Sequence, residues 1–566
     1  MPQLTLKERI RIAALAAGRT QRSALGQIFD SRLLRWSISP PPAADQILIV
    51  PQDLRTADPS FWHEIEQGQF GLAGTLAFLN DRSPFDIDPP SDAWARKLHG
   101  FGWLRNLAVA PEEEAHQTAR RLAAEWAIRS SAQRGIAAEP LVAARRLISW
   151  MSHAIVLLED ADATTYEIIT TSLGRQLASL AASRRDVPDG YPRLLVLIAL
   201  MMADLSIAGH SRQLKNIEAT FAAELDRQIL PDGGHISRNP SVLVEIMLDL
   251  LPLSQCFTAR SRQHPQPLLE VMARVLPVLR FLRMGDGMLA RFNGVSIPTA
   301  AGLATVLAYC DATAPDLGEA RASGYARLEC GRSIVVADVG TSPSLSVAGD
   351  AQAGCLSFEM SVGEDLMFVN GGMPGPAGAD WQPAARATAS HNTLCLAETS
   401  SSTLLTKYPW EPIRHPDNVD WHVDQTDDGL VLEGEHDGYL RRFGLLHSRQ
   451  LVLSADGQRL SGRDRIDSPR HNVRLRVDLP FAIHFHLHPE VSVRGGTQPN
   501  SAVIELPGGE SWKFSAQGAG LTIEDGAYFA NSAGPCPALQ IVLRAATFGE
   551  SEVTWSAERI TTQEEA

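Results

Sequence analysis

The tract PDGGHISRNP, residues 231–240, gathers polar side chains that could serve a carbohydrate cleft. Its Asp-Gly-Gly step needs a tight turn with positive φ, and such a loop presents the side chains that follow it. The side chains presented here are His235, Ser237, Arg238 and Asn239. The same pattern is equally typical of a capped loop between two helices, in which Asn239 begins the second helix.

Two further tracts carry side chains that can move protons. ATASHNTL, residues 387–394, puts His391 at the edge of a predicted strand, and EHDGY, residues 435–439, ends on Tyr439. A tyrosine can act as general acid or base when a neighbouring cation lowers its pKa. The alternatives are a structural histidine in the first tract and a plain Asp-Gly turn in the second.

The tract AIHFHLHP, residues 482–489, spaces three histidines by two residues. On a β-strand His484, His486 and His488 lie on one face, where three imidazoles can hold a transition metal. A polar face of a β-sandwich gives the same pattern, so the spacing leaves both interpretations open.

The elements that must position these residues change in character near residue 320. Before it, apolar residues recur at helical spacing, and residues 192–207 are apolar all round, as in a helix buried among other helices. After it, the period drops to two, as in residues 471–480, and Asp456-Gly457 predicts a hairpin turn. The pattern predicts an all-α domain followed by an all-β domain.

The composition excludes several classes of protein. Among 566 residues, 51 basic and 65 acidic side chains give a net charge of −14, which argues against a nucleic-acid or polybasic membrane-surface protein. An acidic sugar is not excluded, because a local cleft can gather cations. The arginines expected there are Arg193, Arg238, Arg386, Arg441 and Arg442.

The sequence also predicts where the protein resides. Its six cysteines form no C-x-x-C pair and no disulfide framework. The amino end is unlike a signal peptide, and the longest apolar run, residues 194–203, is about half a membrane span. These features predict a cytoplasmic protein without a transmembrane segment.

Four tracts together resemble the heparinase II/III-like polysaccharide lyases over roughly residues 95–560. They are DGGH (232–235), LSFEMSVGEDLMFVNGG (356–372), ATASHNTL (387–394) and HDGYLRRFGLLHSRQLVL (436–453). The resemblance implies an α+β multidomain chain: an N-terminal (α/α) toroid of helical hairpins, then a C-terminal antiparallel β-sandwich. The domains expected are a lead-in at 1–95, the toroid at 96–318 and the β-sandwich at 319–560.

The same resemblance implies a carbon–oxygen lyase that cleaves an acidic polysaccharide or oligosaccharide by β-elimination at a uronic acid. Such chemistry needs a base, an acid and a group that neutralises the carboxylate. The residues expected to be catalytic are His235, His391 and Tyr439. Those expected to bind substrate are Tyr191, Arg193, Arg238, Asn239, Gln352 and Arg386.

The chain departs from the family pattern at the metal positions. Where family members place a histidine, an aspartate and a histidine, this chain has Gln352, Asn370 and His391. Amide oxygens are poor zinc ligands. We therefore expect no required cofactor, and weak or no zinc at His391.

Two alternatives stand beside the lyase. One is a catalytically degenerate protein on the same scaffold that binds glycan or associates with the cell envelope. The other is a glycoside hydrolase in the same toroid, for which Asp232 and Glu245 are available carboxylates. The family resemblance also suggests the periplasm or cell envelope as an alternative location, and a homodimer is left open.

Overall fold

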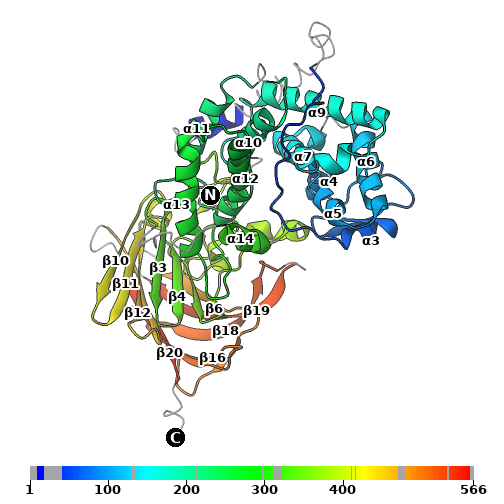
Figure 1. Cartoon of the computed structure of the whole chain (residues 1–566). Helices are drawn as coiled ribbons and strands as arrows, with labels where there is room; N and C mark the ends of the chain where they lie inside the picture. Colours follow the sequence, from blue (N-terminus) through cyan, green and yellow to red (C-terminus); the bar gives the residue numbers. More distant parts are fainter. Residues whose placement is uncertain are drawn as a thin grey trace.

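The computed structural model describes residues 9–17, 41–129, 135–210, 214–295, 299–309, 320–408, 411–414, 416–469, 478–531, 534–547 and 549–560. A helical part is followed by an antiparallel β part (Figure 1). The toroid and the β-sandwich expected from the sequence are therefore confirmed, while the domain limits stay predictions. Most of the alternating tract 471–480 lies outside the described residues.

The helical part is built in two layers. Helices α4, α7, α10, α12 and α14 pack side by side in one layer, and α6, α9, α11 and α13 pack outside them. The helices are α3 (Phe61–Glu66), α4 (Asp92–Gly100), α5 (Leu104–Val109), α6 (Glu113–Ile128), α7 (Pro140–Ser152), α8 (Ala154–Leu158), α9 (Ala163–Ser183), α10 (Tyr191–Ser206), α11 (Ile217–Gln228), α12 (Pro240–Ala259), α13 (Gln266–Phe281) and α14 (Thr299–Ala308).

Helix α10 shows why the sequence folds this way. Every residue from Leu194 to Ala203 is buried, because α10 contacts α7, α9, α11 and α12. A helix enclosed on all sides needs no polar face, which accounts for its continuous apolar run.

Helix α12 is, in the described part of the chain, the one helix long and apolar enough to span a membrane. In its most apolar window 67 % of the residues are buried, against neighbours that include α10, α13 and α14. The core helix of a globular domain has the same length and composition, so this is weak evidence for a span.

An extended lead-in runs over the helices before α3 begins. The Ala44 backbone N–H donates to the Thr170 carbonyl at 3.0 Å, and Leu48 N–H to Ser206 O at 2.7 Å. A β1–β2 hairpin, Gln69–Leu72 and Thr75–Phe78, follows α3. The lead-in thereby brings Asp53 and Arg55 against the toroid helices.

The β part consists of antiparallel sheets. Its larger sheet has the order β10-β11-β12-β13-β20-β17-β16-β15, and two four-stranded sheets have the orders β3-β4-β5-β6 and β18-β19-β14-β7. The strands are β3 (Tyr325–Cys330), β4 (Ser333–Asp338), β5 (Phe358–Val362), β6 (Asp365–Phe368), β7 (Leu394–Leu396), β8 (Thr403–Leu404), β9 (Ile413–Arg414), β10 (Val419–Thr426), β11 (Gly429–His436), β12 (Leu446–Ser454), β13 (Arg459–Asp467), β14 (Leu479–His486), β15 (Ser492–Gly495), β16 (Ser501–Glu505), β17 (Ser511–Gln517), β18 (Gly520–Tyr528), β19 (Cys536–Thr547) and β20 (Ser551–Arg559).

Aromatic side chains join these sheets at the centre of the sandwich. Phe358 stacks on Trp555 with ring centroids 5.7 Å apart, and Phe485 meets Trp555 edge-on at 4.7 Å. These rings come from all three sheets. The predicted turn at Asp456-Gly457 joins β12 to β13, and Gly457 takes a φ of +71° there.

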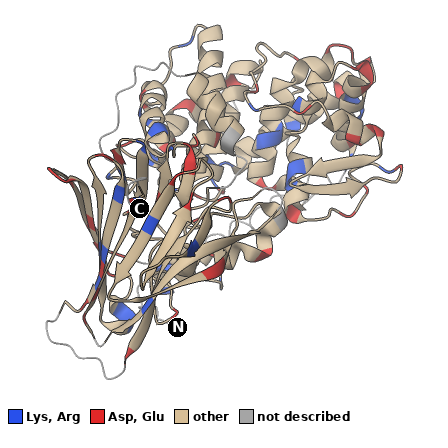
Figure 2. Cartoon of the chain, turned by 90° about the horizontal axis from the view of Figure 1, so that it is seen from below, with Lys and Arg blue, Asp and Glu red and all other residues tan. Residues whose placement is uncertain are grey.

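Charged residues of both signs are interspersed over the helical and β parts (Figure 2). The net charge of −14 is therefore not confined to one part of the molecule. Any charged binding site must be identified from particular side chains.

Candidate functional site

The DGGH turn fastens the helical part to the beginning of the β part. Gly233 has a φ of +93°, and a Cβ at this position would lie 2.0 Å from the Arg274 carbonyl oxygen. The Asp232 carboxylate accepts hydrogen bonds from the Gly234 N–H at 3.0 Å and from the Ser323 N–H at 2.7 Å. These bonds give Asp232 a structural role.

His235 lies inside this turn with both ring nitrogens engaged. Its Nδ1 accepts the Ser237 N–H at 3.1 Å, so the proton sits on Nε2, which donates to Gln228 Oε1 at 2.9 Å. Burial lowers the pKa of His235 to about 3, and the ring is neutral. The geometry fits the structural alternative and leaves no free nitrogen for the proton transfer expected of His235.

The guanidinium donors of Arg238 are all engaged in the same interface. Its guanidinium forms an ion pair with Asp338 and lies over the Tyr325 ring at 5.0 Å. It donates to the backbone carbonyls of Ser323 (2.7 Å), Gly324 (2.8 Å), Gly340 (3.1 Å) and Thr341 (3.0 Å). No donor remains for a substrate carboxylate, so the structure corrects the substrate-binding assignment of Arg238 to an inter-domain anchor.

Asn239 has the capping role that the sequence left open. Its Oδ1 accepts the Ser241 N–H at 2.9 Å at the beginning of α12, and its Nδ2 donates to Asp350 at 3.1 Å. Arg386 is similarly occupied: it is buried and donates to the carbonyls of Ala351 at 2.9 Å and Glu411 at 2.9 Å. Both were expected to bind substrate, and both instead fix the backbone.

Tyr439 is buried in the β-sandwich. Its hydroxyl donates to the Leu394 carbonyl at 2.7 Å, and burial raises the pKa of Tyr439 well above its usual value. The sequence expectation required a cation that lowers this pKa. The burial acts in the opposite direction, so the geometry does not support an acid–base role for Tyr439.

The positions where the resemblance implies a metal hold three buried polar atoms without a hydrogen-bond partner in the described structure: Gln352 Oε1, Asn370 Nδ2 and His391 Nε2. The Asn370 Oδ1 accepts the Asn392 N–H at 2.9 Å, next to His391. His391 donates from Nδ1 to the Ala387 carbonyl at 2.8 Å, and burial lowers its pKa to about 4.

One imidazole and two amides do not fit zinc, which prefers imidazole, thiolate and carboxylate ligands. Within the described residues, no group of three His, Cys, Asp or Glu side chains is arranged to hold a metal ion. The histidines of β14 are engaged in hydrogen bonds instead. His484 bonds to Gln540 Oε1 at 3.0 Å, and His486 bonds to the Ala389 carbonyl at 2.9 Å.

The two remaining candidates lie at the beginning of α10 and lead to a different site. The Tyr191 hydroxyl accepts a hydrogen bond from Arg145 Nη2 at 2.7 Å. Arg193 donates to the Val187 carbonyl at 3.2 Å and lies 3.7 Å from Asp189. Tyr191 therefore joins a set of charged side chains, whereas Arg193 supports the preceding loop.

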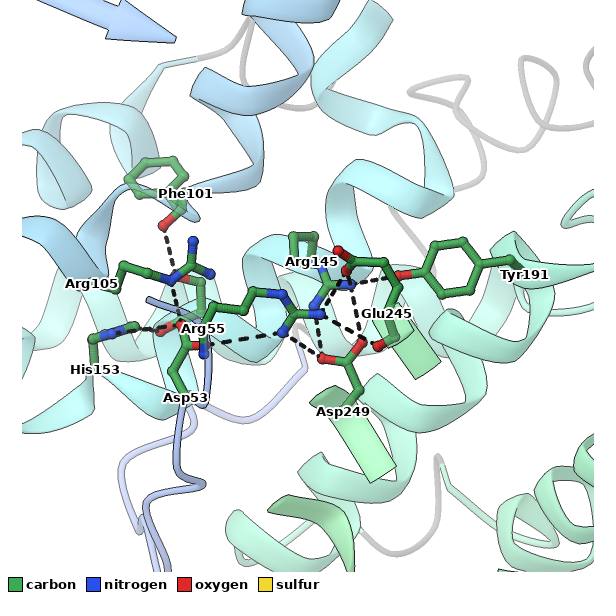
Figure 3. Close-up of polar contacts among 10 residues, drawn as sticks. Asp53, Arg55, Phe101, Arg105, Arg145, His153, Tyr191, Glu245 and Asp249 are labelled. Atoms are coloured by element: carbon green, nitrogen blue, oxygen red, sulfur yellow. Dashed lines mark hydrogen bonds and ion pairs between the residues drawn. The ribbon is translucent and has the colours of Figure 1, made fainter. Parts of the chain in front are cut away.

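That set, which we call the charged cluster, comes from the lead-in and four toroid helices, and Figure 3 labels all of its members except Lys97. Its members are Asp53, Arg55, Lys97, Arg105, Arg145, Glu245 and Asp249. Four cations meet three carboxylates, so the cluster carries an excess positive charge in an acidic protein.

Asp249 is the buried centre of the charged cluster. It accepts from Arg55 Nη1 at 2.9 Å and from Arg145 at 2.8 and 3.0 Å (Figure 3). Burial acts to raise its pKa, but Arg145 and Arg55 outweigh burial and hold the pKa of Asp249 below its usual value. A second bridge joins Asp53 to Arg105 at 2.9 Å.

Lys97 and Glu245 are the accessible charges of the cluster. The Glu245 side chain keeps 44 % of its surface accessible and accepts Arg55 Nη2 at 2.8 Å. Lys97 is exposed, and among the described residues no carboxylate lies within ion-pair distance of it.

Sequence reasoning missed the cluster because its members come from distant segments. Glu245 and Asp249, spaced by four in an apolar helix, were the available signal.

The comparisons with known proteins agree with this fold. The family model "Heparinase II/III-like, C-terminal" matches residues 312–556. Among solved structures, heparinase III superposes with a TM-score of 0.72 at 14 % identity, over 96 % of this chain and 90 % of that chain. A mutant of heparan sulfate lyase HepC from Pedobacter heparinus superposes with a TM-score of 0.62 at 13 % identity, over 99 % and 91 %.

A curated relative resembles the chain more closely in sequence. FtsZ-localized protein C of Caulobacter vibrioides is 30 % identical over 541 residues, which is 92 % of this chain and 90 % of the relative. The full-length match, the C-terminal family model and the two-part fold lead to one conclusion: the chain belongs to the heparinase II/III-like family.

Proposed function

We propose that this protein binds an acidic polysaccharide or oligosaccharide without cleaving it. The carrying observation is that the three side chains expected to move protons are all occupied or enclosed by the fold. His235 bonds through both ring nitrogens, Tyr439 bonds to a backbone carbonyl, and His391 is buried. β-Elimination needs a base and an acid that reach the substrate, and these residues do not supply them.

The charged cluster supports the binding half of this proposal. An acidic glycan needs a local cation, and the cluster has one more cation than it has carboxylates. Arg55, Arg105 and Arg145 pair with these carboxylates, and Lys97 is the remaining cation. Arginine and lysine are the side chains that bind carboxylates and sulfates. Lys97 is exposed, so it is the cation best placed to meet a ligand.

The relative named as FtsZ-localized supports a location for this activity. We extend that localisation to this chain and propose that it acts where FtsZ assembles. A fluorescent fusion imaged together with labelled FtsZ tests the idea. Diffuse fluorescence that does not coincide with labelled FtsZ would count against the location. This holds whether the protein lies in the cytoplasm or in the envelope.

Binding and cleavage are separated by one pair of measurements. The protein is incubated with heparin, heparan sulfate and alginate while ultraviolet absorbance reports any unsaturated product, and calorimetry reports binding. We expect binding to at least one polymer without product. Lys97→Ala should weaken the binding. Lys215 is an exposed lysine before α11, and Lys215→Ala should leave the binding unchanged. Turnover of any bound polymer would overturn the proposal and restore the lyase.

A further inference from the structure

A cavity of about 250 Å³ opens at the edge of the helical part. It lies between the loop that follows the β1–β2 hairpin, residues 84–89, helix α4 and the end of helix α6. Figure 1 places α4 and α6 at the end of the helical part that is remote from the β sheets, so the cavity lies outside the junction of the two parts. An apolar cavity of about 150 Å³ holds a benzene ring, so this one has room for a fused bicyclic ring.

The walls of the cavity are mainly aromatic. The buried indole of Trp94 donates its N–H to the Phe70 carbonyl at 3.2 Å, and that of Trp126 donates to His99 Nδ1 at 3.1 Å. Because both N–H groups are engaged, the two indoles offer the cavity apolar surface. The Phe85 ring lines it from the loop, at 23° to the His99 ring and 6.0 Å from it. Flat aromatic walls favour a planar aromatic ligand.

His99 supplies a hydrogen-bond donor to this cavity. Because Nδ1 accepts from Trp126, the neutral ring carries its proton on Nε2. Burial lowers the pKa of His99 to about 4, so the neutral form is present at pH 7. No described residue accepts a hydrogen bond from Nε2, and this atom is not enclosed by the protein. An oxygen of a ligand in the cavity can therefore accept from His99.

A buried guanidinium lies against one wall of the cavity. Arg146 is 3 % exposed, and its guanidinium lies 4.0 Å from the centre of the Trp126 ring. It donates to Gln176 at 2.7 Å and to the carbonyls of His99 at 2.9 Å and Ala137 at 3.0 Å. Within the described part of the chain no carboxylate pairs with it. Its charge is therefore not neutralised nearby, and it favours an anion over a cation beside His99.

The charges at the rim of the cavity balance one another. Arg129 pairs with Asp86 and Glu125, and its guanidinium lies 5.7 Å from the centre of the Phe85 ring. Arg121 lies 3.5 Å from Glu125 as well. Two guanidinium groups thus face two carboxylates, so the rim favours neither sign. The sign of the ligand that the cavity selects then depends on the buried cation behind the wall.

We propose that this cavity binds a small aromatic carboxylate, with its ring between Phe85 and the two tryptophans and a carboxylate oxygen accepting from His99 Nε2. Burial of the ring and a hydrogen bond to the carboxylate both contribute to binding. An aromatic amine in the same place would meet the donor of His99 and the charge of Arg146, so the site discriminates against it. This site uses no member of the charged cluster and does not depend on the proposed glycan binding.

The test compares three ligands by calorimetry on the full chain: 2-naphthoate, 2-naphthamide and decalin-2-carboxylate. The amide replaces the charged acceptor by a neutral one, and the decalin replaces the flat ring by a saturated one of similar size. We expect 2-naphthoate to bind about tenfold more tightly than the amide, the effect of the charge on one hydrogen bond. We expect it to bind about fivefold more tightly than the decalin, which cannot stack on the aromatic walls.

Two pairs of variants place the ligand in the cavity. Ala95 lines the cavity, so Ala95→Leu should fill it and abolish binding. Ala93→Leu, two residues earlier on α4 and outside the lining, should leave binding unchanged. His99→Phe keeps a ring but removes the donor, and it should bind naphthoate and naphthamide equally. His99→Gln offers an amide oxygen to Trp126 and an amide N–H to the ligand, so it should keep the preference for the carboxylate.

A ligand of this size can reach a Kd of about 1 mM, so absence of binding at about 5 mM 2-naphthoate overturns the inference. Glycan binding would still stand in that case, because it is measured with other ligands and with Lys97→Ala. Equal binding of naphthoate and naphthamide by the wild type refutes the assignment of a carboxylate. Urea unfolding identifies the folded variants, and binding that persists in a folded Ala95→Leu also refutes the inference. Should this variant fail to fold, a preference for the carboxylate that survives in His99→Phe refutes it instead.

Discussion

Replacement of Arg238 by alanine distinguishes an anchor between domains from a substrate-binding arginine. The side chain is buried, pairs with Asp338 and donates to four backbone carbonyls. Arg238→Ala therefore leaves a buried carboxylate without its cation. Asp338 keeps only weaker compensation, such as the Asn293 Nδ2 donor at 3.0 Å.

The expected loss is large. Removing one partner of a buried ion pair costs about 3–5 kcal/mol, because the other charge stays buried and uncompensated. Each carbonyl left without a donor costs about 1 kcal/mol or more where it stays buried. Domains are stable by about 5–15 kcal/mol, so Arg238→Ala should remove a third or more of the unfolding free energy.

Urea unfolding followed by tryptophan fluorescence measures this loss, and calorimetry on the folded fraction measures glycan binding. A double-mutant cycle with Asp338→Asn isolates the pair: the double variant should be more stable than the sum of the two single losses predicts. An unfolding midpoint equal to that of the wild type, together with tenfold weaker glycan binding, would refute the anchor and make Arg238 a ligand-binding residue.

Buried groups give three further predictions. The folded-state pKa of His235, about 3, lies below its usual 6.5, so its stabilisation is present above pH 6.5 and is lost as the pH falls toward 3. Between pH 7 and pH 5, the free energy of unfolding should fall by about 2 kcal/mol less in His235→Asn than in the wild type, which urea unfolding at the two pH values measures. Tyr439→Phe should cost about 1 kcal/mol in unfolding free energy and leave glycan binding unchanged, since it removes one buried hydrogen bond; weaker binding would contradict this. Gln352→His with Asn370→Asp should create zinc binding detectable by calorimetry, and a silent titration of the folded double variant would show that these positions do not converge with His391.

The fold could be predicted because it depends on patterns that are local in the sequence. The apolar run 194–203 predicts a helix enclosed by others, and α10 is that helix. The Asp456-Gly457 turn predicts a hairpin, which β12 and β13 form. The enclosed helix requires a continuous apolar run, and the hairpin turn requires residues that accept positive φ. A single tract of sequence is enough to specify each of them.

The site could not be predicted in the same way. A motif such as DGGH specifies a turn and the polar groups that hold it, but the same residues satisfy a buried interface or a catalytic cleft. The hydrogen-bonding groups of His235 and Arg238 are engaged in such an interface. Conversely, Lys97 belongs to no motif and looks like an ordinary solvated charge. The charged cluster forms only when the lead-in, α4, α5, α7 and α12 pack together.

This contrast leads to a physical criterion for a binding site in a protein of two packed parts. Polar groups at the junction must satisfy one another because water is excluded, so they lose their capacity to bind a ligand. Capacity remains where a charge reaches solvent and has no ion-pair partner among the described residues, as with the exposed Lys97. The overall charge of −14 then has little influence on what the charged cluster binds, since an anion placed there interacts chiefly with the nearest cations and distant carboxylates are screened.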